Sequence, residues 1–144
     1  MVDPKKIIVA LDYDHIDNAL ALADNLNPDS CRLKIGKELF SKYGPEIVSQ
    51  IQKKGFEIFL DLKFHDIPTT VYKACISAFS LNVWMLNIHL SGGLNMAEAA
   101  MKAKLDCESS SKIIGVTVLT SLSDEDCLNI YAVSYTHLTL PTTG

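Results

Sequence analysis

Basic residues are scarce in this sequence and form no large cluster. Its 144 residues carry 13 lysines and arginines against 17 aspartates and glutamates, and the formal net charge is −4. Surfaces that bind nucleic acid or anionic membranes group their lysines and arginines. We therefore expect neither a nucleic-acid nor a membrane partner.

A secretory signal is also missing from the amino-terminal segment. Asp3, Lys5 and Lys6 precede a short apolar run, whereas a signal peptide has a long apolar stretch there. The four cysteines are scattered and form no C-x-x-C motif, being Cys31, Cys75, Cys107 and Cys127. We expect reduced thiols in a cytoplasmic protein, and no zinc site.

One stretch, 74–97, has no charged residue and is long enough to raise the question of a membrane span. Serine, asparagine, histidine and a Gly-Gly pair interrupt it, so we expect a buried helix, a strand and a turn. The hydrophobic content of 48% is enough for one globular core.

Short apolar runs alternate with amphipathic segments along the chain. The runs predict strands at 7–12, 31–35, 56–63, 83–89 and 112–119. The amphipathic segments predict helices at 16–26, 46–54, 70–81 and 94–104. Pro45 and Gly55 flank one helix as a first-turn proline and a terminating glycine do, and Ser123 with Asp126 resembles a capping box. This rhythm predicts an α/β fold with a parallel sheet.

Each predicted strand ends in polar residues, namely Asp12, Lys34, Asp61 with Lys63, His89, and Thr120. Positions of the opposite parity are mainly apolar, so one face of the sheet should pack on helices. An open doubly wound sheet also binds ligands at its carboxyl ends, but inward polar groups on every strand fit a (β/α)₈ TIM barrel better. Such a barrel needs roughly 200–250 residues, so we expect only about its first five strands here.

The last residues depart from this rhythm. Residues 133–144 become rich in threonine and lack a strand–helix pattern. We expect residues 1–132 to form the amino-terminal part of the barrel domain, and 133–144 to be disordered or foreign to it.

The most informative segment is 61–70, where two carboxylates and an amine lie within six positions. Asp61 and Lys63 should project from the same face of a strand, and Asp66 follows before Pro68 stops the ladder. An isolated D-x-K pair is usually a surface ion pair. Charges crowded at the end of a buried strand are costly unless they pair, and such crowding can build a site with perturbed protonation.

The pattern Asp61-x-Lys63-x-x-Asp66-Ile-Pro-x-Thr70 resembles the signature of the orotidine 5′-phosphate decarboxylase family. Supporting blocks occur in order at Val9–Asp12, Leu33–Gly36, His89 with Gly92-Gly93, and Val116–Ser121. The resemblance covers residues 7 to about 132. It implies decarboxylation of orotidine 5′-monophosphate to UMP in pyrimidine biosynthesis, by a cytoplasmic homodimer that uses no metal or cofactor.

The resemblance also implies roles for individual residues. Lys63 would stabilise the carbanion left by loss of CO₂ and then protonate it, with Asp61 beside the departing carboxylate. Lys34 would pair with Asp61 and contact ribose, and Asp66 would complete the charged array of the partner subunit. The substrate-binding residues would be Asp12, Lys34, Ile67, Thr70 and Thr120. Alternating charges would hold the Lys63 ammonium ionised and in place, so that the site need not reorganise during the reaction.

Two alternatives stay open. Metal-dependent keto-gulonate phosphate decarboxylases share D-x-K-x-x-D, although Ile67-Pro68 and Thr70 argue against them. The chain could also be a non-catalytic fragment that associates through exposed strand edges. The later strands and loops, which supply the phosphate-binding arginine in the family, are missing, so we expect this chain alone to be inactive.

Overall fold

The computed structural model describes residues 4–132, which form one parallel sheet with helices between its strands. The strands are β1 (Ile7–Ala10), β2 (Cys31–Gly36), β3 (Ile58–Phe64), β4 (Met85–His89) and β5 (Lys112–Val116). They lie side by side in chain order, β1-β2-β3-β4-β5, and every neighbouring pair is parallel. The predicted α/β class and parallel sheet are confirmed.

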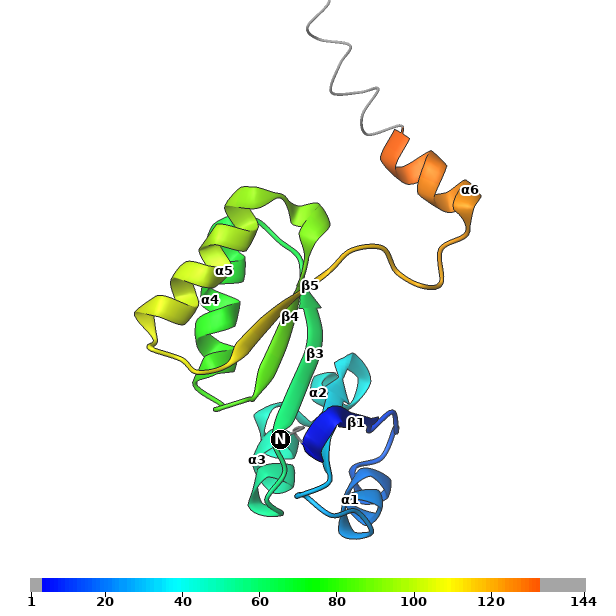
Figure 1. The fold of residues 1–144 in the computed structure, drawn as a ribbon, viewed down its shortest axis with the longest axis vertical. Helices are drawn as coiled ribbons and strands as arrows, with labels where there is room; N and C mark the ends of the chain where they lie inside the picture. The colour runs from blue at the N-terminus through cyan, green and yellow to red at the C-terminus, as the bar shows by residue number, and fades with distance from the viewer. Residues whose placement is uncertain (1–3, 133–144) are drawn as a thin grey trace, which may run out of the picture.

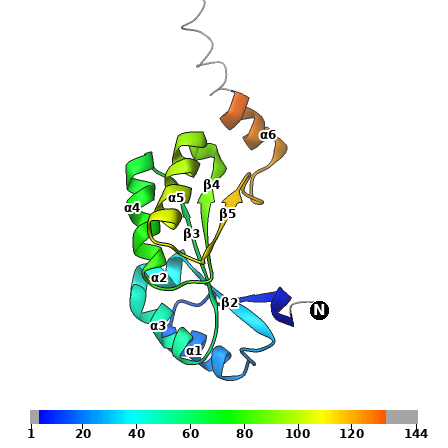
Figure 2. The same ribbon diagram turned by 60° about the vertical axis from the view of Figure 1, so that its left-hand side comes forward.

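The helices that connect the strands lie along one face of this sheet, and one further short helix follows β5. They are α1 (Ile16–Asp24), α2 (Lys37–Tyr43), α3 (Pro45–Lys53), α4 (Pro68–Phe79), α5 (Leu94–Asp106) and α6 (Asp124–Cys127). Short helical turns flank them at Pro4–Lys6, Leu90–Gly92 and Leu128–Ala132. In Figure 1, α4 and α5 pack together beside β4, and α6 stands apart from them. Figure 2 shows no helix against the opposite face of β3 and β4.

Strand parity decides which side chains form the core. Alternate residues Leu33 and Ile35 on β2, and Ile58 and Leu60 on β3, are at most 1% exposed. They point to the helices, because successive side chains of a strand face opposite sides. The residues between them face the open side. The predicted division into an apolar face and a polar face is therefore confirmed on the central strands.

Helix boundaries follow the local sequence signals. Pro45 occupies the first turn of α3 and Gly55 follows its end with φ of +92°, a conformation that glycine adopts without strain. Ser123 and Asp126 form the predicted capping box at the start of α6. The pattern did not predict α2, whose seven residues end at Gly44, where φ is +59°.

Two strand predictions were too long at their carboxyl ends. β1 ends at Ala10 and β5 at Val116, rather than at 12 and 119. The Leu11 N–H still donates to the Lys34 carbonyl at 2.9 Å, so the ladder continues one residue beyond β1. The predicted tail, 133–144, lies outside the described residues.

The open side of the sheet is filled near the amino ends of the strands. The Arg32 guanidinium lies 4.0 Å from the centre of the Trp84 ring, and its Nε donates to Glu57 at 3.0 Å. Arg32 is only 8% exposed. Above it, Phe59 pairs in register with Met85, and both are buried. These buried side chains lie on the open side of the sheet, on the amino-terminal side of the polar strand ends.

Among residues 4–132, no helix has the length and hydrophobicity that crossing a bilayer requires. All four cysteines are free thiols, with Cys31 and Cys75 buried in the core. Burial raises the pKa of the Cys75 thiol to about 11.

Candidate active site

Four charged side chains meet at the carboxyl ends of the first three strands. The Lys34 ammonium lies 3.2 Å from Asp12 Oδ1 and 3.4 Å from Asp61 Oδ2. The Lys63 ammonium lies 2.6 Å from Asp61 Oδ1. The order Asp12–Lys34–Asp61–Lys63 therefore alternates in sign, with Asp61 between two lysines. The structure brings Lys34, Asp61 and Lys63 into contact, and it adds Asp12 at the end where the sequence prediction had no member of the array.

Asp61 is the most enclosed member of this array. Its side chain is 11% exposed, compared with 22% for Lys34 and 28% for Lys63. Burial raises the pKa of the Asp61 carboxyl, but hydrogen bonds from Lys63 and Asn87 and the charges of Lys63 and Lys34 outweigh it, so the pKa is lowered overall. Asp61 is thus held as a carboxylate against the desolvation that burial imposes.

Lys63 reaches Asp61 from an irregular strand. The pairing of β3 with β4 shifts between Leu60 and Phe64, which marks a bulge. Within it Lys63 has φ of +50°, a left-handed conformation that a lysine rarely adopts. Its N–H donates to Asn87 Oδ1 at 2.8 Å, and Asn87 Nδ2 donates to Asp61 Oδ1 at 2.7 Å.

The rest of the signature segment opens α4 at the same edge. Asp66 is exposed, and its Oδ1 accepts the Ile67 N–H at 2.7 Å. Ile67 is 65% exposed, and Thr70 in the first turn of the helix is also exposed. These three side chains lie at the surface, in the segment that joins β3 to α4.

A hollow of about 530 Å³ lies at the ends of β4 and β5, within the usual size range of small-molecule sites. Its lining includes His65, His89, Thr117 and Tyr131. The imidazole rings of His65 and His89 are 5.3 Å apart. Burial, and then the nearby charges of His65, Lys37 and Lys63, lower the pKa of His89. Thr120 is exposed in the turn that follows β5 and does not line this hollow.

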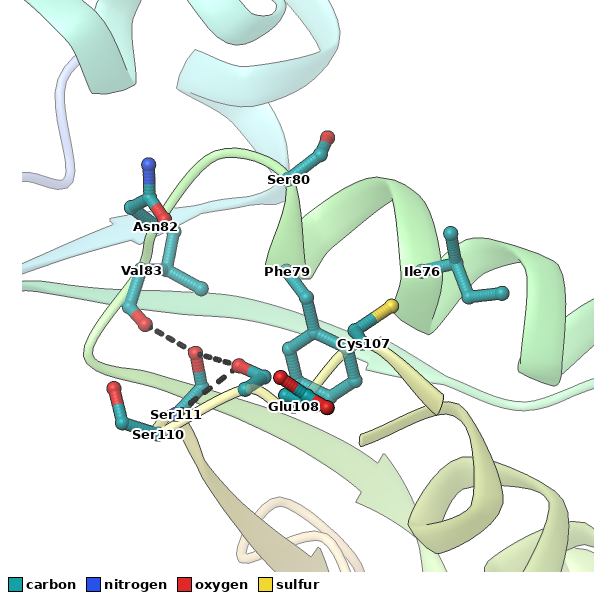
Figure 3. Close-up of a pocket in the computed structure, with 10 residues that line it drawn as sticks. Ile76, Phe79, Ser80, Asn82, Val83, Cys107, Glu108, Ser110 and Ser111 are labelled. Carbon is teal, nitrogen blue, oxygen red and sulfur yellow. Dashed lines mark hydrogen bonds between the residues drawn. The ribbon is translucent and has the colours of Figure 1, made fainter. Parts of the chain in front are cut away.

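A second cavity, of about 460 Å³, lies at the opposite end of the strands (Figure 3). The loops before β4 and β5 border it, and Ser111 there donates through Oγ to the Val83 carbonyl at 2.6 Å. Ligands of parallel α/β folds bind at the carboxyl ends of strands. We therefore place the site at the charged array and not in this cavity.

Within residues 4–132 the side chains of His, Cys, Asp and Glu form no group of three that could hold a metal ion. The array itself offers two ammonium groups and two carboxylates, which hold one another in place.

A model of one protein family, described as "Orotidine 5′-phosphate decarboxylase / HUMPS family", matches residues 5–140. The chain belongs to this family. Relatives named orotidine 5′-phosphate decarboxylase include that of Shewanella sediminis, 56% identical over 123 residues, which are 85% of this chain and 53% of the relative. That of Tolumonas auensis is 52% identical over 131 residues, which are 90% of this chain and 56% of the relative.

Solved structures carry the same fold. The chain superposes with a TM-score of 0.81 on orotidine 5′-phosphate decarboxylase from Lactobacillus acidophilus, at 33% identity, over 88% of this chain and 59% of that one. An uncharacterised conserved protein from Geobacillus kaustophilus gives a TM-score of 0.76 at 35% identity, over 83% of this chain and 57% of that one. The five strands are therefore part of a TIM barrel, as predicted. The chain spans about half the length of the curated relatives that it matches.

Sequence reasoning missed Asn87. It is 2% exposed and touches both Asp61 and Lys63. The available signal was its position on a strand in the same parity as His89, since a polar residue there faces the open side of the sheet.

Proposed function

We propose that the family barrel to which this chain contributes decarboxylates orotidine 5′-monophosphate to UMP, a step of pyrimidine nucleotide biosynthesis. The observation that carries the proposal is the alternating array, in which Lys34 and Lys63 flank the enclosed carboxylate of Asp61. The names of the relatives support the choice of substrate. Free cysteines, two of them buried, are compatible with a reducing cytoplasm.

The proposed chemistry uses side chains alone, without a metal or cofactor. The bond between the pyrimidine ring and the carboxylate breaks, CO₂ departs, and the electron pair stays on the ring carbon. The Lys63 ammonium stabilises this charge and gives the carbon a proton. Asp61 lies beside the departing carboxylate and orients Lys63, with which it is in contact at 2.6 Å.

The other residues are proposed to bind the nucleotide. Asp12 and Lys34, which are 3.2 Å apart, would contact ribose hydroxyls. Ile67 and Thr120 are both exposed at the carboxyl edge. Both would contact the nucleotide, Thr120 at the edge of its pyrimidine ring. Remote contacts of this kind hold the substrate in the geometry that reaction requires.

A completed chain tests the activity. The chain is extended by the part of the Shewanella sediminis relative that it does not cover, and UMP formation from orotidine 5′-monophosphate is measured. We expect turnover that EDTA does not reduce, and none above background from the 144-residue chain alone, because five strands do not close a barrel.

Two results would contradict this function. One is a folded, completed chain that leaves orotidine 5′-monophosphate unchanged. The other is EDTA-sensitive decarboxylation of keto-gulonate phosphate, which would favour the metal-dependent lyases that share the D-x-K-x-x-D pattern. Turnover by the 144-residue chain near that of the completed chain would contradict the expected inactivity.

We further propose that the completed protein is a homodimer in which Asp66 and Thr70 reach the partner's site. Both are exposed in the segment that follows the array strand β3, and dimers are the commonest symmetric assemblies. Coexpression of Lys63→Ala and Asp66→Ala chains should then restore about a quarter of wild-type activity, since half the dimers are mixed and each has one intact site. Activity no higher than that of the separate variants would place Asp66 in its own subunit's site.

A further inference from the structure

Asn87 is a buried polar residue whose side chain hydrogen-bonds to Asp61 and Lys63 of the charged array. It lies on β4 at 2% exposure, on the open side of the sheet above Met85. A buried amide without hydrogen-bond partners destabilises the folded state. Asn87 has both kinds of partner, because its Nδ2 donates to Asp61 and its Oδ1 accepts from Lys63.

The first bond fixes the plane of the Asp61 carboxylate. Asn87 Nδ2 lies 2.7 Å from Asp61 Oδ1, the same oxygen that contacts the Lys63 ammonium at 2.6 Å. The other oxygen, Oδ2, faces Lys34 at 3.4 Å. A carboxylate held by donors on both oxygens cannot rotate about its bond without breaking one of these contacts.

The second bond fixes the backbone of Lys63. The ladder between β3 and β4 is interrupted from Leu60 to Phe64, so it supplies no regular partner for this segment. Lys63 N donates to Asn87 Oδ1 at 2.8 Å instead. A left-handed lysine is strained and persists only where its surroundings impose it. Asn87 provides one such restraint.

We propose that Asn87 is a positioning residue, whose amide sets the Asp61 carboxylate and the Lys63 backbone together so that the Lys63 ammonium meets the reacting carbon. The geometric half of this inference stands on the bonds above, and its catalytic half rests on the proposed function. Asparagine suits both bonds, because its side chain has a donor and an acceptor on one planar group.

Two substitutions separate the bonds. Asn87→Leu has similar size and loses both. Asn87→Asp keeps an acceptor for the Lys63 N–H, but replaces the donor to Asp61 with a second carboxylate. Met85→Leu, two residues earlier on the same face of β4, is the matched control for altered packing. All three are made in the completed chain, with two readouts, the Asp61 carboxyl titration by carbon-13 NMR and the steady-state kinetics.

We expect the pKa of Asp61 to rise in Asn87→Leu, which removes a hydrogen bond to the charged form, and further in Asn87→Asp, which adds a like charge. Met85→Leu should leave it unchanged. In Asn87→Leu, kcat should fall about 10- to 100-fold while KM changes less than about threefold, because misplacing a reacting group by about 1 Å costs on that order.

The two readouts keep the inferences apart. An Asp61 pKa that is the same in wild type and both Asn87 variants overturns the positioning role, whatever the activity. A shifted pKa with unchanged kcat overturns its catalytic half. If the wild-type completed chain does not decarboxylate the substrate, the proposed function fails, and the titration alone still decides whether Asn87 orients Asp61.

Discussion

Replacing Lys63 with alanine in the completed chain is expected to lower kcat by about 10⁴-fold or more. General acid catalysis contributes roughly 10²–10⁴-fold and a preorganised charge roughly 10²–10³-fold, and Lys63 is proposed to supply both. The loss should appear in kcat and not only in KM, because the ammonium acts on charge that develops in the transition state. The measurement is steady-state UMP formation.

A lysine away from the site provides the control. Lys53 is exposed at the end of α3, and Lys53→Ala should leave kcat within about twofold of wild type. Lys63→Ala with more than a tenth of wild-type kcat would rule out Lys63 as the proton donor.

Replacing Asp61 with alanine is expected to lower the free energy of unfolding of the 144-residue chain by about 3 kcal/mol at neutral pH. Removing one partner of a largely enclosed ion pair leaves the other partner uncompensated. Here Lys63 loses the carboxylate that it contacts, and Lys34 keeps only the exposed Asp12. Urea unfolding of the two chains measures the difference.

This difference should depend on pH. The folded pKa of Asp61 is lowered, so its stabilisation is fully present above the unfolded value of about 3.9 and is lost as the pH falls through the folded pKa. The difference in the free energy of unfolding between wild type and Asp61→Ala should therefore become smaller in acid. The exposed Asp29 is the control, and Asp29→Ala should change stability by less than about 0.5 kcal/mol at any pH. If this difference in stability is the same in acid, Asp61 stabilises the fold through packing and not through its charge.

Much of this fold follows from the sequence because its signals are local. Alternating apolar residues on β2 and β3 set the face that meets the helices, and Pro45 and Gly55 set the limits of α3. The convergence of Asp12, Lys34 and Asp61 could also be predicted, since polar residues at the carboxyl ends of adjacent parallel strands must be neighbours in space.

The remainder depends on contacts between strands that no local pattern encodes. Regular alternation predicts that Asp61 and Lys63 project side by side, and they do meet, but through a bulge in which Lys63 is left-handed. The bulge in turn requires a partner on β4, and Asn87 supplies it. Neither feature can be read from one segment alone, because each depends on the register between two strands.

The packed interior below the array determines how molecules reach it. Arg32, Phe59 and Met85 lie on the open side of the sheet towards the amino ends of their strands, and each is less than 10% exposed. In a closed barrel, side chains packed at the amino ends of the strands would leave the interior accessible only from the carboxyl ends. Any ligand of the charged array would then enter and leave at that same end, so a bound molecule would have to depart before another could enter.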